Sequence, residues 1–370
     1  MRVSSMAGDT IQQAERSSRN FHAVGTRVPG APVGVPNDPA LPGLALLHCP
    51  EHLLAELTPL LSGRLGNRHT ELTPNCLLVR RYVPGKRCIV KFEVTMPAAP
   101  GIPGRRHCFF AKFYTGGRGA RVYKNCEQLW RRGFSRGCFM ISEPLAYHPA
   151  WQVLVLSWEN GRSLRDIALA GQDAHRAVEG AAKWLHRLHT CGFNGGRVYT
   201  FRRHLHILGV RMRSLTSVHR EAGRAFGDVL DRIRHRLLKL EPLAWAPTHR
   251  DFSPEHLIVE GQRFTGLDFD EFCQYDPLFD VAHFVAHLRF LALISFGAVN
   301  SLDDLAARFE DSYASESGSF SAARLRLFTA IAYLKLAYVE AMVRSNVDGK
   351  QVVDTLLEEA CRFAESKNEV

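Results

Sequence analysis

The sequence lacks the marks of several broad protein classes. Its net charge is +10, yet no run of five or more Lys and Arg residues is present. A basic charge that is spread in this way suits nucleic acid, anionic lipid or an acidic small molecule, and its simplest interpretation is a solvated surface. Because no RNA- or DNA-binding motif occurs, we expect no nucleic-acid partner.

Paired cysteines are also missing. The chain has nine cysteines, and none forms a CxxC pair or a Cys/His cluster with zinc spacing. An odd number of scattered cysteines favours free, mostly buried thiols in a reducing compartment. We therefore expect a cytoplasmic protein.

Long uninterrupted apolar runs are absent as well. The two longest apolar stretches, 284–299 and 328–343, are each broken by charged or polar side chains, and neither is predicted to span a membrane. These interrupting residues are His287, Arg289, Lys335 and Glu340. The first residues contain no apolar segment of the kind that a secretory signal needs, so we expect no membrane association.

What is present is an ordinary globular composition. The chain has 370 residues, of which 46% are hydrophobic and 23% charged, and this length is enough for two domains. Residues 1–43 are poor in large apolar side chains and contain five prolines, which predicts a flexible arm. Residues 44–62 show helical periodicity and are predicted to form one amphipathic helix.

Strand patterns follow. Residues 76–94 are predicted to form two strands joined at Pro84-Gly85-Lys86, and 108–114 a third. A glycine-rich turn then leads to a helical stretch that contains Glu127, and the next strands are predicted at 139–141, 145–147 and 152–158. The first half is therefore predicted to be a strand-rich sheet with one inserted helix.

From residue 161 the periodicity becomes helical. Helices are predicted at 163–170, 174–190, 201–217, 220–240, 277–296, 301–314, 320–345 and 350–366. The predicted class is α+β, with a small antiparallel sheet lobe and a larger helical lobe. The predicted division is an arm at 1–43, a first lobe at 44–157 and a second lobe at 158–370.

The densest polar signal interrupts these helices at 247-PTHRDFSPEHLIVEG-261. A turn at Glu260-Gly261-Gln262 predicts a hairpin that brings Asp268 back toward Asp251 and His256. Asp268 lies within an apolar run, where a carboxylate is costly unless it is paired or bound to metal. Convergent carboxylates suit a hard divalent cation with phosphate oxygens. Asp270, one strand period further on, is predicted to share the face of Asp268.

Several motifs in the same order resemble those of the aminoglycoside phosphotransferase and choline kinase family, which shares the protein-kinase fold. That family has HxDxxxxN, then an (I/L)DF or (I/L)DW element about 17 residues after the Asp, then GDPxxDLA. The matching segments here are His249-Arg250-Asp251, His256, Leu267-Asp268-Phe269-Asp270 and 276-DPLFDVA-282. The combination is more specific than HRD alone.

The resemblance implies roles for these residues in an ATP-dependent phosphotransferase. Asp251 would accept a hydrogen bond from the acceptor hydroxyl, and Asp268 would bind Mg²⁺ at the phosphates. His249 would brace the loop, and Asp280 would hold its backbone. Asp276 with Pro277 would cap the next helix.

In the first half of the chain, the resemblance implies which residues would bind the nucleotide. Lys112 would pair with Glu127, fifteen residues later, and position the phosphates of ATP; a solvent-facing lysine is the alternative. Backbone amides around Gly85 would approach phosphate; an ordinary hairpin turn is the alternative, because GxGxxG is absent. The backbone of Ser157 to Glu159 would bind adenine.

His256 departs from the family pattern, which has a metal-binding Asn at this position. Three interpretations follow: His256 binds metal through a ring nitrogen and favours one Mg²⁺ or Mn²⁺; it holds a metal-bound water or a phosphate oxygen; or the second metal site is absent and activity is slow or lost. The expected cofactors are ATP and Mg²⁺, with Mn²⁺ as the alternative metal.

The acceptor is expected to be a small molecule with a hydroxyl group. The segment 201–240 has ten Lys and Arg residues against three acids, which is the wrong sign for a polycation and favours a neutral or anionic, sugar-like acceptor. The alternative is a nucleotide-binding pseudokinase that acts as a protein-interaction module. The sequence leaves the oligomeric state open.

Overall fold

The computed structural model describes residues 37–65, 73–96, 105–240, 244–318, 321–343 and 349–365. Residues 1–36 of the predicted arm lie outside this part. The chain divides into two compact units. The first contains the residues up to Arg131 together with Ser142–Glu159, and the second contains Arg132–Ile141 together with the chain from Asn160 onward.

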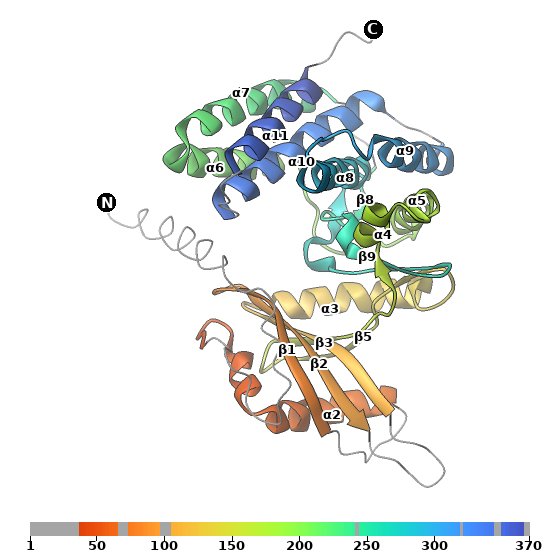
Figure 1. The fold of residues 1–370 in the computed structure, drawn as a ribbon. Helices are drawn as coiled ribbons and strands as arrows, with labels where there is room; N and C mark the ends of the chain where they lie inside the picture. The colour runs from red at the N-terminus through yellow and green to blue at the C-terminus, as the bar shows by residue number, and fades with distance from the viewer. Residues whose placement is uncertain are drawn as a thin grey trace. The chain divides into compact units, whose positions relative to one another are not determined.

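The first unit is a five-stranded antiparallel sheet with helices. Its elements are η2 (Pro42–His48), α2 (Pro50–Leu65), β1 (Thr73–Val83), β2 (Arg87–Met96), β3 (Arg105–Tyr114), α3 (Arg118–Leu129), β5 (Pro144–His148) and β6 (Val153–Ser157). The strand order is β1-β2-β3-β6-β5 (Figure 1). The predicted hairpin at Pro84-Gly85-Lys86 is confirmed, since β1 and β2 pair up to Val83 and Arg87.

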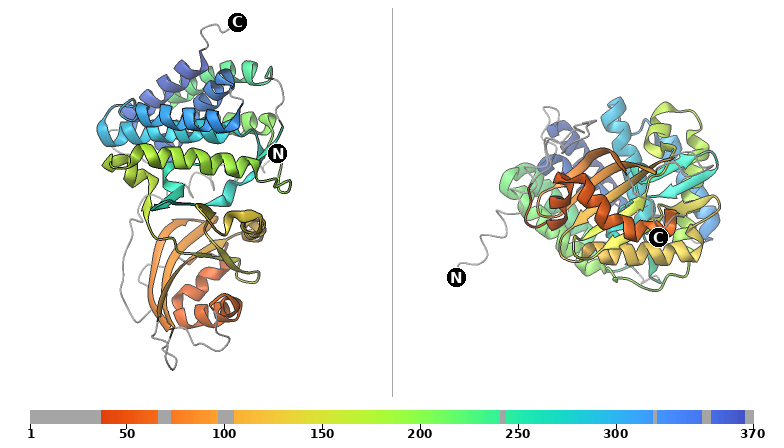
Figure 2. Two further views of the ribbon diagram at one scale, coloured as in Figure 1. Left: turned by 90° about the vertical axis from the view of Figure 1, so that its right-hand side faces the viewer. Right: turned by 90° about the horizontal axis from the view of Figure 1, so that it is seen from below.

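The core of this unit lies between one face of the sheet and η2 with α2 (Figure 2). Alternate residues of β2 such as Val90 and Phe92 point to this face and pack with helical leucines such as Leu57. The prediction of one continuous helix over 44–62 is wrong, because the helix breaks at Cys49. Cys49 precedes Pro50, and steric clash with a proline ring disfavours the helical conformation at the residue before it.

The second unit is mainly helical. Its elements are β4 (Phe139–Ile141), β7 (Arg162–Ser163), α4 (Leu164–Ala170), α5 (Ala174–Thr190), α6 (Phe201–Val218), α7 (Arg220–Leu237), β8 (Ala246–Thr248), η4 (Pro254–His256), β9 (Leu257–Glu260), β10 (Arg263–Gly266), η5 (Phe269–Glu271), β11 (Cys273–Tyr275), α8 (Leu278–Phe296), α9 (Asp303–Ser317), α10 (Ala322–Val343) and α11 (Gly349–Ala364). The eight helices predicted from residue 161 onward are present as α4 to α11, with ends that differ by a few residues, and the 3₁₀ turns η4 and η5 were not predicted.

Strand β4 belongs to this second unit, which differs from the predicted continuous first lobe over 44–157. It pairs in parallel with β10, in the sheet order β4-β10-β9-β7. Trp184 of α5 adds a link, since its indole Nε1 donates to the Met140 carbonyl oxygen at 2.8 Å. The sequence of a three-residue strand does not indicate which strand it pairs with. The pairing of β4 with β10 is therefore known only from the structure.

The hairpin β9–β10 packs closely on α5. A Cβ atom at Gly266 would lie 2.1 Å from the Trp184 ring, so this position has no room for any side chain. Gly266 pairs with Leu257 at the end of the hairpin. The close contact therefore fixes the point from which the chain leaves β10 toward Asp268.

Helix α8 is long and apolar enough to cross a membrane by length and composition alone. Buried core helices of soluble proteins meet the same criterion, and 72% of its most apolar window is buried within the structure. Its Asp280 and His283 are fully buried and contact the polar loop that follows β8.

Candidate active site

The loop from His249 to His256 follows β8 and is held by a buried carboxylate. Asp280, in the first turn of α8, accepts hydrogen bonds from the backbone amides of His249 and Arg250, both at 2.7 Å. His189 of α5 contacts the same carboxylate at 3.2 Å. Arg250 has a φ of 64°, a left-handed conformation that is strained for this residue type. The expectation that Asp280 holds the loop backbone is confirmed.

His249 braces the loop from inside. Its side chain is buried, and its Nε2 donates to the Leu267 carbonyl oxygen at 2.7 Å. Its ring also packs against Phe252 and Phe269. Burial is the main reason why the pKa of His249 lies below the ordinary value, so the ring is neutral at neutral pH. The predicted bracing role is confirmed by these contacts.

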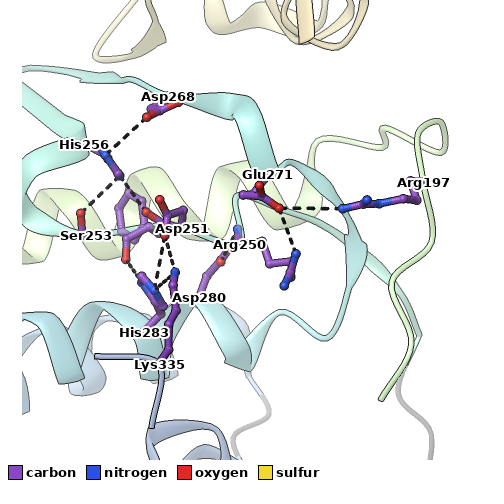
Figure 3. Close-up of polar contacts among 11 residues, drawn as sticks. Arg197, Arg250, Asp251, Ser253, His256, Asp268, Glu271, Asp280, His283 and Lys335 are labelled. Carbon is purple, nitrogen blue, oxygen red and sulfur yellow. Dashed lines mark hydrogen bonds and ion pairs between the residues drawn. The ribbon is translucent and has the colours of Figure 1, made fainter. Parts of the chain in front are cut away.

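Asp251 meets a lysine and a histidine from two other helices (Figure 3). Lys335 of α10 donates to Asp251 Oδ1 at 2.5 Å, and His283 Nε2 lies 3.6 Å from the same oxygen. His283 Nδ1 donates to the Phe252 carbonyl oxygen at 2.8 Å, so Nε2 carries the lone pair and accepts from Lys335 at 2.8 Å. Lys335 thus ties the loop carboxylate to a buried neutral imidazole.

These contacts determine the charge of Asp251. Burial raises the pKa of this carboxyl group, but the positive charge of Lys335, with smaller effects of His256 and His283, outweighs burial and holds the pKa well below its ordinary value. Burial and the same lysine hold the pKa of His283 well below the usual range. At neutral pH Asp251 is therefore a carboxylate and His283 a neutral imidazole, and Lys335 contacts both.

His256 and Asp268 lie side by side, as the predicted hairpin requires. The Leu267 amide donates to the His256 carbonyl oxygen at 2.9 Å, and His256 Nε2 lies 3.8 Å from Asp268 Oδ2. His256 Nδ1 donates to the Asp251 carbonyl oxygen at 2.7 Å. In the neutral form of the ring, this bond leaves the lone pair on Nε2, on the side of the Asp268 carboxylate (Figure 3).

The prediction that Asp270 shares a strand face with Asp268 is wrong. Strand β10 ends at Gly266, and Asp268 has a left-handed backbone conformation with φ 60° before the 3₁₀ turn η5. The two-residue alternation of a strand therefore does not extend through Asp268. Asp270 is buried within η5.

The donor set fits a cation that also binds phosphate oxygens. Among the residues that the structure describes, no three His, Cys, Asp or Glu side chains gather as a metal site. Asp268 and the Nε2 lone pair of His256 supply two donors, and Mg²⁺ in nucleotide enzymes commonly takes one or two protein ligands with phosphates and waters. The bond from His256 Nδ1 to a carbonyl oxygen is the type of contact that orients metal-binding histidines.

In the first unit, Lys112 lies on β3 and Glu127 on α3. Lys112 is 6% exposed, which contradicts the solvent-facing alternative. Glu127 accepts from Arg131 Nη2 at 3.3 Å, one turn along the helix. A role of both residues toward nucleotide phosphates stays a prediction.

Gly85 occupies the turn between β1 and β2, with φ 65°. Its amide donates to Asp38 Oδ2 at 2.7 Å, and the Tyr82 hydroxyl donates to the same oxygen at 3.0 Å. Burial and the Asp38 carboxylate raise the pKa of Tyr82 to about 12. The amide proposed to approach phosphate thus already contacts an anionic oxygen.

Ser157 and Glu159 follow β6. The Ser157 amide donates to the Glu143 carbonyl oxygen at 3.0 Å, and its carbonyl oxygen accepts from the Ser142 hydroxyl at 2.7 Å. The Ser157 hydroxyl donates to the Glu159 carboxylate. Because the Ser157 amide is already used, contacts to adenine in this segment would come from other backbone atoms, and they stay a prediction.

Sequence reasoning missed Lys335 and His283. Both interrupt apolar helices, in IAYLKLAYV and DVAHFVAH, and a polar side chain among apolar neighbours needs a partner. A polar side chain within an apolar helix therefore indicates that the residue has a partner. Periodicity alone does not predict that the partner is Asp251.

A family model described as the phosphotransferase enzyme family matches residues 104–325 of the chain. Among curated proteins, none matches. The match begins at β3 and extends into α10, so it contains the loop of Asp251, the hairpin of Asp268 and the buried Asp280.

Solved structures similar to the chain include three kinases. A thermostable mutant of aminoglycoside phosphotransferase APH(4)-Ia, in a ternary complex with ADP and hygromycin B, has 15% identity and a TM-score of 0.56, covering 84% of this chain and 100% of that one. The ethanolamine kinase of Plasmodium vivax has 13% identity and a TM-score of 0.53, covering 86% and 89%. The amicoumacin kinase hAmiN, with AMP-PNP, Ca²⁺ and Ami, has 12% identity and a TM-score of 0.58, covering 77% and 88%. At identities this low the likeness is one of fold, and it confirms the predicted protein-kinase-like class.

Proposed function

Since the chain belongs to the phosphotransferase enzyme family, we propose that it transfers the γ-phosphate of ATP to a hydroxyl group of a small molecule. The observation that carries the proposal is the loop of Asp251. Lys335 keeps the Asp251 carboxylate ionised, and a second carboxylate, Asp268, lies 3.8 Å from His256 Nε2. One group is suited to a hydroxyl proton and the other to a phosphate-bound cation.

Asp251 would orient the acceptor hydroxyl and take its proton. Lys335 holds Oδ1, which leaves Oδ2 to accept a hydrogen bond from the acceptor. The depressed pKa of Asp251 makes it a weak base in the ground state. Its main contribution would therefore be to position the hydroxyl for in-line attack, with proton transfer late in the reaction.

The nucleotide would be bound by residues that the resemblance assigns. Lys112 would hold the phosphates, with Glu127 as its partner, and the backbone near Glu159 would bind adenine. Asp268 and His256 would hold the divalent cation, whose bound charge would offset that of the phosphate oxygens. An imidazole donor favours Mn²⁺ over Mg²⁺ more than the Asn of the family pattern does.

The decisive experiment is a screen for ATP consumption over a library of hydroxylated metabolites, with Mg²⁺ and with Mn²⁺. We expect turnover with at least one acceptor, and Asp251→Asn should lower kcat roughly a hundredfold or more. Asp231→Asn, an exposed position on α7, is the matched control and should leave kcat unchanged.

The alternative function, a pseudokinase interaction module, gives a different result. It predicts that ATP raises the melting temperature without any need for metal and that no acceptor is phosphorylated. It also predicts that basal ATP hydrolysis is absent from the wild-type protein, so that Asp251→Asn has nothing to remove.

A further inference from the structure

We propose that the acceptor carries an oxyanion, a phosphate or a carboxylate, and that Arg211 and Arg250, with Arg197 and Lys335, bind it beside Asp251. This inference rests on the proposed function, and it narrows the acceptor to one chemical class. All four cations belong to the second unit.

The four cations come from separate segments, and the three arginines among them lie over two aromatic rings. The guanidinium of Arg250 lies 3.5 Å above the centre of the Tyr199 ring, and that of Arg197 lies 5.6 Å from it. The guanidinium of Arg211, on α6, lies 5.5 Å from the Tyr338 ring of α10. Lys335 lies one helical turn before Tyr338 on α10.

Few carboxylates neutralise this cluster. Among the described residues, those within ion-pair distance of the four cations are Asp251 and Glu271: Asp251 pairs with Lys335, while Glu271 pairs with Arg250 at 3.2 Å and Arg197 at 3.9 Å. Arg211 forms no ion pair with any residue in the described part of the chain, although it is half-buried. The cluster thus has an excess of positive charge where solvent screening is reduced.

Burial and the positive charge of the cluster both lower the pKa of two groups, Arg211 and His204. Burial lowers the pKa of Arg211, and the nearby charge of Arg250 lowers it further. Burial is also the main reason why the pKa of His204 lies well below the ordinary value, and the charges of Arg250, Arg211 and Lys335 add to this effect. The His204 ring also lies 5.5 Å from the Tyr199 ring, between ring centres, so this imidazole is next to the ring that Arg250 and Arg197 contact.

Polar atoms in the cluster are left without partners. The Tyr199 hydroxyl is buried and makes no hydrogen bond to any described residue, and the residue is 1% exposed. The Nε of Arg250 is also buried, without an acceptor in the described part of the chain. A buried donor without an acceptor costs roughly 1 to 3 kcal/mol, and an oxyanion supplies acceptors to hydroxyl and guanidinium donors alike.

The position of the cluster links it to the reacting group. Arg250 precedes Asp251 in the chain, and Lys335 contacts the Asp251 carboxylate directly. An anion bound here would therefore lie close to the hydroxyl that Asp251 orients. Guanidinium groups match the planar edges of phosphate and carboxylate, and the same charges would repel a polycationic acceptor.

The test measures anion binding without nucleotide or metal. Inorganic phosphate and acetate are titrated into the full-length protein by calorimetry at constant ionic strength. We expect phosphate to bind, and Arg211→Gln to weaken that binding roughly tenfold or more. Arg211→Lys, which keeps the charge, should retain part of the affinity. Arg213→Gln, an exposed arginine on the same helix, is the matched control and should leave it unchanged.

Two results would overturn the inference. One is the absence of phosphate and acetate binding to the wild-type protein. The other is binding that Lys112→Met abolishes and Arg211→Gln does not, because the anion would then occupy the residue assigned to the nucleotide. An affinity for acetate equal to that for phosphate would indicate that the acceptor carries a carboxylate.

The two proposals fail in different ways. ATP turnover that is confined to neutral or cationic acceptors would leave the kinase function standing and remove the anion site. Phosphate binding that depends on Arg211, with no turnover over any acceptor, would keep the anion site and remove the kinase function.

Discussion

Asp251 remains a carboxylate because a lysine 84 residues further along the chain contacts it. Burial alone would raise its pKa, and Lys335 reverses the sign. A folded pKa below the unfolded value of about 3.9 means that the pair stabilises the fold above about pH 4. This stabilisation is lost as the pH falls through the folded pKa.

Lys335→Met should reverse the pH dependence that Asp251 gives to the free energy of unfolding. At pH 7 we expect a loss of about 1 to 3 kcal/mol in the free energy of unfolding, toward the lower end because the Asp251 side chain is 30% exposed. The gap to the wild-type protein should narrow as the pH is lowered to about 4, because Asp251 in the variant then binds a proton. Urea unfolding at a series of pH values measures the gap. The double variant Asp251→Asn/Lys335→Met is the control, and its difference in free energy of unfolding from the wild-type protein should not vary with pH over this range. A difference between Lys335→Met and the wild-type protein that is constant with pH would refute the pairing.

His256→Asn should shift the metal preference. The imidazole Nε2 is a softer donor than an amide oxygen, so its replacement should favour Mg²⁺ relative to Mn²⁺. The measurement is the metal dependence of the melting temperature with AMP-PNP, together with turnover in each metal. Ser253→Ala is a control, since Ser253 Oγ contacts His256 Nδ1 at 3.3 Å and not the Nε2 side. An unchanged preference in His256→Asn would exclude this residue as a ligand.

At the level of elements, the turn of the β1–β2 hairpin is already bonded to a carboxylate of the same chain. Asp38 accepts from the Gly85 amide and from the Tyr82 hydroxyl, so a carboxylate holds the place that the resemblance assigns to phosphate. An amide hydrogen cannot serve both oxygens fully at once. The carboxylate and the nucleotide would therefore compete for this turn.

Asp38→Ala should have opposite effects on stability and binding. The loss of two hydrogen bonds should cost about 1 to 3 kcal/mol in urea unfolding, while the affinity for ATP, measured by calorimetry, should increase. Tyr82→Phe removes one of the bonds and leaves the Gly85 amide bonded, so it should lower stability without changing ATP affinity. Equal ATP affinity in the wild-type protein and in Asp38→Ala would show that the Gly85 amide does not bind phosphate.

At the scale of the whole molecule, local patterns predicted most elements. Helical periodicity predicted the α-helices described in the second unit but not its short 3₁₀ turns, and the turn at Gly261 predicted the hairpin that brings Asp268 to His256. Failures came where geometry changed within a few residues: the break at Cys49, imposed by the following proline, and the left-handed turn at Asp268.

Contacts between distant segments were the part that the sequence could not predict. Trp184 binds the Met140 carbonyl oxygen and joins β4 to the second unit, and Lys335 reaches Asp251 from a helix near the other end of that unit. Each such pair depends on how packed elements are oriented, which no short window of residues encodes. The polar interruptions of α8 and α10 show that partners exist, and only the fold identifies them.

The contact between Lys335 and Asp251 also sets an order of events during synthesis. The loop with the acidic group leaves the ribosome well before α10, and translation at roughly 5 to 20 residues per second separates the two by several seconds. Until α10 packs, that carboxylate lacks the lysine that holds its pKa low. The loop that contains Asp251 thus gains its lysine partner only after a helix far downstream in the chain has been synthesised and has packed.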